Sequence, residues 1–368
     1  MNILRRIRPA IAALQPYSSA HMETTEQALA APQARLNANE LPFAPPVDCG
    51  FQLNRYPHPQ PPDMRQRLAE ILRVPDNHLL LTRGSDEAID LLVRVFCEAG
   101  EDAVAITPPV FGMYRVAAEI QGAQVVEFPL LAENGFQPDW PRLQAELPKN
   151  TKLVFLCSPN NPVGNSLDAS AVLAFCQAVS SRALVVLDEA YIEFSPQKSL
   201  VDAIADVPNL AVLRTLSKAW GLAGARLGAL VAQPALIAIM RRVLPPYPIP
   251  EPVRYAVMQA TDQPAAKAAR QAVQAVMAEK KRLQAFLSAS PLVKQVYPSD
   301  TNFLLVRFYQ PERVFHACAQ AGLLVRDQSR QPGLAGCLRI TVGRAEDNQR
   351  LQSVLQVLAT QRKSEEQP

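Results

Sequence analysis

The sequence has little of what marks a membrane-bound or nucleic-acid-binding protein. No apolar stretch in its 368 residues reaches the roughly 18 residues that a membrane-spanning helix needs. The net charge is only +3, and no basic run is longer than the short cluster from Arg5 to Arg8. Composition therefore gives no support to nucleic-acid binding. With 48% hydrophobic and 19% charged residues, the chain reads as a soluble globular protein.

Patterns of metal ligands and disulfide pairs are also missing. The six cysteines are scattered without a CxxC pair, and the four histidines share no metal-binding spacing. Because several cysteines lie in apolar runs, we expect most of them to be buried thiols in a reducing cytoplasm, and we expect no zinc site. The residues concerned are Cys49, Cys97, Cys157, Cys176, Cys318 and Cys337, and His21, His58, His78 and His316.

A complete signal peptide is missing as well. The chain begins with a basic segment, but the apolar part from Pro9 to Leu14 is about one turn shorter than the hydrophobic region of a signal peptide. It also lacks a persuasive cleavage site. We therefore predict that residues 1–34 form an N-terminal arm and that the protein is cytoplasmic.

What the sequence does contain is a regular alternation of short β-branched runs and helical patterns. Residues 85–99 and 167–179 repeat apolar side chains at helical spacing. Near-continuous apolar strands separated by helices predict an α/β fold with a mostly parallel sheet covered by helices on both faces. The predicted strands are residues 79–82, 103–107, 124–128, 152–157, 183–187, 210–213 and 227–231.

The length of the chain and a proline-rich segment predict two domains. Closely spaced prolines between Pro245 and Pro252 end any helix and stiffen the connection. After them come a helical stretch interrupted near Pro264 and a strand–helix–strand–strand–helix series, which predict a smaller α+β domain. We place the large domain at residues 51–250 and the small domain at residues 35–50 and 251–368.

Polar side chains that suit one cofactor follow the ends of several predicted strands. Lys218, Asp188 with Tyr191, and Asn161 each lie just beyond the carboxyl end of a strand, where open α/β sheets bind ligands. Pyridoxal phosphate needs a lysine for its Schiff base, an acid that keeps its ring nitrogen protonated, and donors for its ring oxygen. Alone, each residue is more simply a surface charge, a strand cap or a turn. Together they indicate this cofactor.

A seat for a phosphate group is indicated by a strand, a glycine turn and a helix start. Free amides at Gly84, Ser85 and Asp86, together with the helix dipole, would bind an anion. An ordinary helix start with acidic residues in its first turn is the alternative. Ser217 and Arg226 add a hydroxyl and a guanidinium, and both groups bind phosphate well.

Three further residues have two interpretations each. Phe111 either stacks on the pyridine ring or belongs to the core. Arg339 interrupts a predicted strand of the small domain, and an arginine that faces inward needs an anion. That anion is either a substrate carboxylate or phosphate, or the partner in a structural salt bridge. Arg326 invites the same two interpretations.

These residues together resemble the fold-type I, class II pyridoxal-phosphate aminotransferases, and the resemblance covers nearly the whole chain. The broadly shared motifs are residues 158–164, 188–191, 215–218 and 222–226. Shorter motifs resemble, more narrowly, the histidinol-phosphate aminotransferases of L-histidine biosynthesis. They are residues 36–40, 55–57, 82–87, 111–114, 326–328 and 336–343.

The resemblance implies a role for each site residue. Lys218 would carry the cofactor, Asp188 would pair with its ring nitrogen, and Asn161 and Tyr191 would hold its ring oxygen; Lys218, Asp188 and Tyr191 would be catalytic. The ring would stack on Phe111. The cofactor phosphate would lie on Gly84, Ser85, Asp86, Ser217 and Arg226. Tyr56 would reach the cofactor of a neighbouring subunit, which implies a homodimer. The substrate would face Tyr17, Asn39, Arg326 and Arg339.

The implied reaction moves the amino group of L-histidinol phosphate to 2-oxoglutarate and yields imidazole-acetol phosphate and L-glutamate. No nucleic-acid or membrane partner is implied. Three positions depart from the family pattern: Phe111 replaces a tyrosine, Val163 a threonine and Leu41 a polar residue. Because Leu41 lies in the segment nearest the substrate, it leaves substrate specificity less certain than the reaction class.

Three alternatives to this function stay open at the level of sequence. The first is an aminotransferase of the same subgroup that acts on aromatic or other amino acids. The second is a lyase similar to threonine-phosphate decarboxylase, which would release carbon dioxide. The third is a non-catalytic ligand sensor, which usually carries a DNA-binding module for which 368 residues leave no room.

Overall fold

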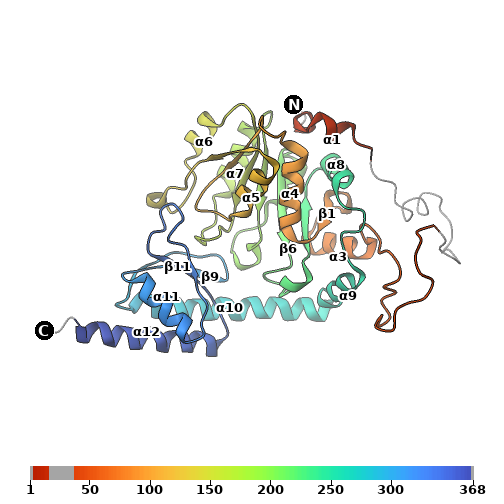
Figure 1. Cartoon of the computed structure of the whole chain (residues 1–368). Helices are drawn as coiled ribbons and strands as arrows, with labels where there is room; N and C mark the ends of the chain where they lie inside the picture. Colours follow the sequence, from red (N-terminus) through yellow and green to blue (C-terminus); the bar gives the residue numbers. More distant parts are fainter. Residues whose placement is uncertain (1–2, 16–36, 366–368) are drawn as a thin grey trace.

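The structure is a computed structural model that describes residues 3–15 and 37–365. Its larger sheet contains seven strands in the order β1-β7-β6-β5-β4-β2-β3 (Figure 1). β2 to β6 pair in parallel, whereas β7 runs antiparallel to both β1 and β6. The prediction of a mostly parallel sheet is therefore confirmed. The strands are β1 (Leu79–Thr82), β2 (Ala103–Ile106), β3 (Gln124–Glu127), β4 (Thr151–Cys157), β5 (Leu184–Asp188), β6 (Leu210–Thr215) and β7 (Gly228–Val231).

Helices cover both faces of this sheet because the strands are apolar on both sides. Along β5, Val185 and Leu187 face one core while Leu184 and Val186 face the other, as the alternation of side chains along a strand requires. α4 (Gly84–Phe96), α5 (Met113–Gln121) and α8 (Pro234–Val243) cover one face; α3 (Pro62–Leu72), α6 (Trp140–Glu146) and α7 (Ala169–Ala178) cover the other.

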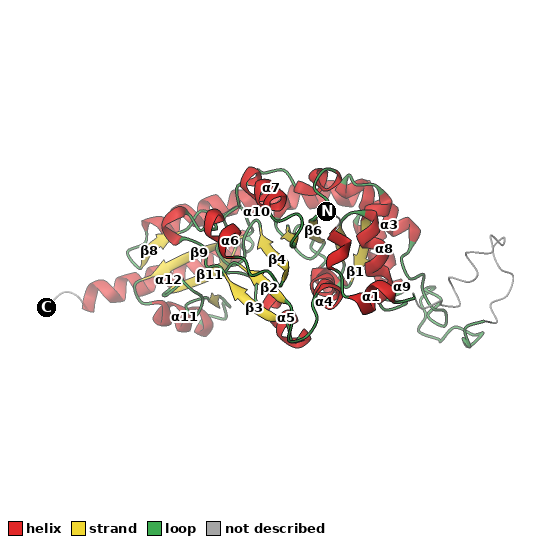
Figure 2. Ribbon diagram, turned by 90° about the horizontal axis from the view of Figure 1, so that it is seen from above, coloured by secondary structure: helices red, strands yellow, loops and turns green. Residues whose placement is uncertain are grey.

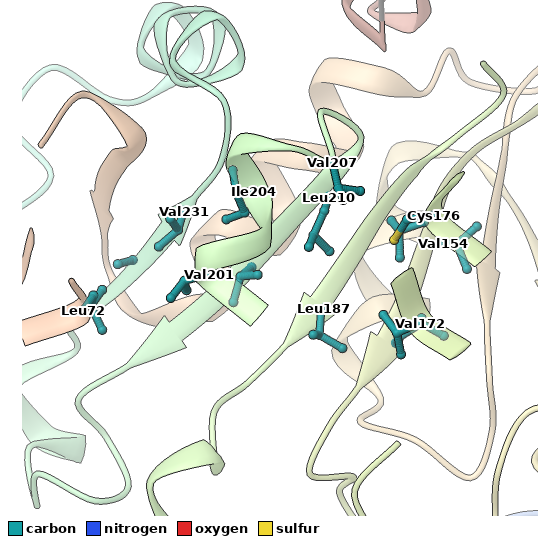
Figure 3. Packing of buried hydrophobic residues seen from close by; sticks show 14 of the residues in the cluster. Leu72, Val154, Val172, Cys176, Leu187, Val201, Ile204, Val207, Leu210 and Val231 are labelled. Carbon is teal, nitrogen blue, oxygen red and sulfur yellow. The ribbon is translucent and has the colours of Figure 1, made fainter. Parts of the chain in front are cut away.

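Figure 3 shows part of one of these cores, in which Leu187 and Leu210 of the strands face Val172 and Cys176 of α7. All four side chains are buried. Burial of each such aliphatic side chain contributes about 1.5–3 kcal/mol. The two cores therefore fix the sheet firmly, and with it the rim that carries the polar residues.

The smaller sheet is antiparallel and has the strand order β10-β11-β9-β8. It packs with α11 (Pro311–Gln320) and α12 (Ala345–Glu365) and lies beside the larger sheet (Figure 2). The predicted series of elements is wrong in one respect, because β8 was not expected. β8 lies at the sheet edge, and its central residues Lys294 and Gln295 are exposed, so it lacks an apolar run. The strands are β8 (Val293–Val296), β9 (Phe303–Phe308), β10 (Arg326–Asp327) and β11 (Cys337–Thr341).

The helical stretch after the proline-rich segment forms two helices, α9 (Glu251–Ala260) and α10 (Gln263–Ala289). The predicted interruption near Pro264 is confirmed, because α9 ends at Ala260 and Pro264 lies in the first turn of α10, where the missing N–H costs nothing. The Asp262 carboxylate caps this turn by accepting from the N–H of Ala265 at 2.8 Å. Figure 1 shows that α10 runs from α9 to the smaller sheet and so spans both parts of the molecule. The domain boundaries themselves stay predictions.

The described part of the N-terminal arm docks on the larger sheet's helices. Ile3 and Ile7 are buried against α4 and α8, and Arg8 pairs with Glu98 at 2.9 Å. Five cysteines are buried and Cys49 is exposed. The prediction that most of the thiols are buried is therefore confirmed. Within residues 3–15 and 37–365, no helix combines the length and the apolar character needed to cross a membrane.

Candidate active site

The carboxyl edge of the larger sheet opens into a cavity of about 140 Å³. Parallel pairing places the ends of β4 and β5 side by side, with Cys157 opposite Asp188. Most of the residues predicted from the sequence to bind the cofactor line this cavity. They are Ser85, Asp86, Phe111, Asn161, Asp188, Tyr191, Ser217, Lys218 and Arg226.

Asp188 lines the cavity and is only 3% exposed. One carboxylate oxygen accepts from the N–H of Ala190 at 3.0 Å, and the other accepts from the hydroxyl of Tyr114 at 2.7 Å. Burial raises the pKa of Asp188, and the hydrogen bond from Tyr114 opposes that rise. The carboxylate is thus held in a fixed plane, and an ionised carboxylate has further lone pairs that can face the cavity.

Lys218 follows β6 and extends into the same cavity, with its Nζ 5.6 Å from the ring centre of Tyr191. Burial lowers the pKa of its ammonium group, and the nearby guanidinium of Arg339 lowers it further; Asp86 and Asp188 act in the opposite direction. A lower pKa increases the fraction of neutral amine, which is the form that attacks a carbonyl carbon.

Asn161 and Tyr191 present hydrogen-bond donors on one side of the cavity. The guanidinium of Arg339 donates to Oδ1 of Asn161, which leaves the amide NH₂ available as a donor. Burial raises the pKa of Tyr191, so its hydroxyl keeps its proton. Both groups suit a phenolate-like oxygen, as the sequence led us to expect.

The start of α4 and the turn around Arg226 approach each other closely. A Cβ atom on Gly84 would lie 2.7 Å from Nη2 of Arg226, and one on Gly228 would lie 2.5 Å from the backbone nitrogen of Ser85. Gly84 also has a φ of +72°, which favours glycine. The missing side chains therefore let the guanidinium of Arg226 and the backbone of β7 approach the start of α4 closely. First-turn amides and a guanidinium beside them are groups that suit a phosphate.

The two arginines that we expected to meet the substrate do not line this cavity themselves, although Arg339 contacts Asn161, which does. Arg339 of β11 and Arg326 of β10 lie directly opposite each other across the small sheet. Like charges in such a pair repel, so the pair favours an anion between or above them. The guanidinium of Arg339 also lies 5.3 Å from the ring centre of Phe303. Arg326 is exposed.

Two other predicted residues, Tyr56 and Asn39, do not reach this cavity within the described part of the chain. Tyr56 is 51% exposed and stacks on Tyr247 with ring centres 4.5 Å apart. Asn39 is exposed and has a φ of +56°. Neither lines the cavity. Tyr17 lies outside the described residues. The prediction that these residues serve the site stays a prediction.

Several residues that line or support the cavity were missed in the sequence. Cys157, Ala190, Thr215 and Ala223 line it, and Tyr114 lies beneath it. Tyr114 follows Phe111 by three positions, a spacing that places both on one side of a helix start. That spacing was the available signal.

Comparison with known proteins agrees with this geometry. Residues 18–356 match the family of class I and II aminotransferases. The histidinol-phosphate aminotransferase of Xanthomonas euvesicatoria pv. vesicatoria (strain 85-10) is 46% identical over 357 residues, which are 96% of this chain and 97% of the relative. The crystal structure of histidinol-phosphate aminotransferase from Sinorhizobium meliloti in complex with pyridoxal-5'-phosphate has a TM-score of 0.75 and 25% identity, and the match covers 95% of this chain and 97% of that one.

The chain belongs to the class I and II aminotransferase family. It is therefore an enzyme that uses pyridoxal phosphate, as the residues at the sheet rim predicted. The narrower resemblance to histidinol-phosphate aminotransferases is confirmed as well. The fold alone does not distinguish a histidinol-phosphate aminotransferase from other enzymes that share it. L-threonine-O-3-phosphate decarboxylase from Porphyromonas gingivalis, at 23% identity over 84% of this chain and 91% of that one, has a TM-score of 0.66.

Proposed function

We propose that this enzyme transfers the amino group of L-histidinol phosphate to 2-oxoglutarate, in the biosynthesis of L-histidine. The observation that carries the proposal is the 46% identity to a histidinol-phosphate aminotransferase over almost the full length of both chains. The opposed pair Arg326 and Arg339 supports it, because guanidinium groups bind phosphate and carboxylate through the same fork of donors. A site that alternates between a phosphate monoester and a dicarboxylate needs such a group.

The cavity residues that the sequence predicted each have a task in this proposal. Bound pyridoxal phosphate would supply an electron sink that makes the substrate Cα–H acidic. Lys218 would hold the cofactor through its Nζ, and its neutral amine would accept the proton from the substrate Cα. Asp188 holds a proton on the ring nitrogen. Asn161 and Tyr191 donate to the ring oxygen, and Phe111 packs on the ring face.

The phosphate of the cofactor has its own group of residues. We assign to it the amides of Gly84, Ser85 and Asp86, the hydroxyl of Ser217 and the guanidinium of Arg226. Arg226 is paired with Asp86 at 3.0 Å, so the guanidinium is already oriented toward the start of α4. Such preorganisation lowers the entropy cost of binding.

We further propose that the enzyme is a cytoplasmic homodimer with shared sites. An exposed apolar surface supports the dimer: Leu41 is 67%, Phe43 73% and Val47 76% exposed. Large apolar side chains at this level of exposure in one short segment are typical of protein–protein contacts. Tyr56, in the same part of the chain, is half-exposed and would reach the partner's cofactor. Tyr17 and Asn39 would complete the substrate side.

Half-reactions test the substrate. The enzyme with bound cofactor is mixed with one amino donor at a time, and the loss of its visible absorption is followed by stopped flow. We expect L-histidinol phosphate to react with a kcat/KM roughly 30-fold or more above that of L-histidinol, which lacks the phosphate, because charged hydrogen bonds to arginine are lost. A higher kcat/KM for L-phenylalanine or L-tyrosine, or release of carbon dioxide, would contradict the proposal.

A further inference from the structure

We propose that Tyr114 is a positioning residue that holds Asp188 in the orientation in which its carboxylate meets the ring nitrogen of the cofactor. The inference goes beyond the assignment of Asp188 itself and rests on it. Tyr114 lies on α5, 74 positions from Asp188 in the sequence, and its hydroxyl donates to Oδ2 of Asp188 at 2.7 Å. The side chain is fully buried, with 0% exposure.

Packing fixes the ring of Tyr114 in this position. It stacks on Phe155 of β4 with ring centres 4.7 Å apart and an angle of 6° between the ring planes. Its other neighbour is Phe111, whose ring meets it edge-on at 5.7 Å and 82°. Offset and edge-on aromatic pairs of this kind are favourable arrangements. The hydroxyl therefore has a defined location under the cavity.

The hydrogen bond has only one direction. Burial and the adjacent Asp188 carboxylate raise the pKa of Tyr114 well above its usual range, so the phenol keeps its proton and donates it. The carboxylate then has one oxygen bound to the phenol and the other to the N–H of Ala190 at 3.0 Å. Two donors on two oxygens set the carboxylate plane. They leave lone pairs on both oxygens for a donor in the cavity.

Tyr114 also connects two of the residues that line the cavity. Phe111 and Asp188 both line it, and Tyr114 contacts both. Loss of the hydroxyl alone would leave the aromatic packing intact, because phenylalanine fills the same space. The Tyr114→Phe variant therefore isolates the hydrogen bond from the packing.

The test compares pyridoxal phosphate with its 1-deaza analogue, in which a C–H group replaces the ring nitrogen. The analogue keeps the aldehyde, the ring oxygen and the phosphate, so it still reports Lys218, Asn161, Tyr191 and the phosphate seat. The dissociation constants of both compounds are measured by equilibrium dialysis with the cofactor-free protein. We expect the wild type to prefer pyridoxal phosphate, and Tyr114→Phe to lower that preference by roughly tenfold while leaving binding of the analogue within about threefold.

Two variants serve as controls. Tyr297→Phe makes the same chemical change at another buried tyrosine, which packs against Phe136, and should leave both dissociation constants unchanged. In an Asp188→Asn background, adding Tyr114→Phe should leave the preference for pyridoxal phosphate unaltered, because the charged acceptor is already gone. Thermal unfolding of each cofactor-free protein confirms that it is folded.

The possible results distinguish the role of Asp188 at the ring nitrogen from the role of Tyr114 in positioning Asp188. If the wild type does not prefer pyridoxal phosphate over the analogue, the assignment of Asp188 to the ring nitrogen is wrong. If the wild type does but Tyr114→Phe keeps the full preference, Asp188 serves the ring nitrogen without Tyr114 and the present inference fails. Equal weakening of both compounds would show that Tyr114 only supports the packing, and would also overturn the inference.

Discussion

The two sides of the cavity differ in how completely a single chain builds them. On the cofactor side, Lys218 and Arg226 are exposed, but the groups at and beneath the end of β5 are buried: Asp188 is 3% and Tyr191 6% exposed, and Asp188 is hydrogen-bonded within the chain. On the substrate side, Arg326 and Asn39 are exposed. A buried polar group must be hydrogen-bonded within the folded chain. An exposed polar group stays hydrated and can bind a ligand or a partner subunit later.

Burial on the cofactor side also shifts the pKa values of its ionisable groups. Burial raises the pKa of the Asp188 carboxyl and lowers the pKa of the Lys218 ammonium. Both shifts disfavour the charged form. At Lys218 the shift favours the neutral amine that the chemistry needs, whereas at Asp188 the hydrogen bond from Tyr114 opposes the shift and favours the carboxylate. In the proposed reaction the substrate side binds two different anions in turn, and the half-buried Arg339 and the exposed Arg326 suit that task. Four measurements test this contrast.

The largest effect should come from the cofactor side. Lys218→Ala removes both the group that holds the cofactor and the group that moves the Cα proton, so kcat should fall by roughly 10⁴-fold or more. Steady-state assays with L-histidinol phosphate measure this loss. Lys198→Ala, at an exposed lysine of a nearby loop, should keep wild-type activity. In borohydride-treated wild type, reduced cofactor on any lysine other than Lys218 would contradict the assignment.

On the substrate side, Arg339→Ala should have the second largest effect. Loss of a charged hydrogen bond to an anion costs about 2–4 kcal/mol, so kcat/KM should fall roughly 30- to 1000-fold. Both half-reactions should weaken, because the same arginine meets the phosphate and the carboxylate. Arg344→Ala, at an exposed arginine just beyond β11, is the matched control and should be close to wild type.

The contact between Arg339 and Asn161 gives the Arg339→Ala experiment a second readout, the affinity for the cofactor. Cofactor affinity should stay close to wild type if the two sides are separate, because the Asn161 amide keeps its donors. A large loss of cofactor would show that Arg339 belongs to the cofactor side as well. Weakening of the 2-oxoglutarate half-reaction alone would move the phosphate site to Tyr17 and Arg326.

Subunit mixing tests whether a second chain completes the substrate side. If sites are shared, the Lys218→Ala protein and the Tyr56→Ala protein should each be weakly active when pure. A mixed dimer has one site with both defects and one with neither. After random exchange, about a quarter of all sites should be wild type, and activity should rise toward that fraction. Activity that stays at the average of the two separate proteins, or a fully active monomer in ultracentrifugation, would exclude shared sites.

The parts of the molecule that the sequence could predict are those set by local patterns of the chain. All seven strands of the larger sheet and the polar residues at their ends were predictable, because apolar runs and the rim position are local properties of the chain. Tyr114 was missed because its partner Asp188 is 74 positions away, and only the packing of α5 on the sheet joins them. The edge strand β8 was missed because exposed polar residues hide its pattern. The location of Tyr56 depends on its tertiary contact with Tyr247, which no local pattern encodes.

The smallest predicted effect is on the pKa of Lys218, and it tests whether charges from both sides meet at this amine. In the cofactor-free protein, burial and then Arg339 lower that pKa, while Asp86 raises it. Arg339→Gln should therefore raise the pKa, reduce the neutral fraction at pH 8 and slow acylation of Lys218, followed by peptide mass spectrometry. Asp86→Asn should lower the pKa and speed acylation. A change in access alone has no reason to follow the sign of the charge removed, and the exposed Lys198 should react at the same rate in all three proteins. If both variants shift the Lys218 rate in the same direction, the two sides of the cavity are not coupled electrostatically through this amine.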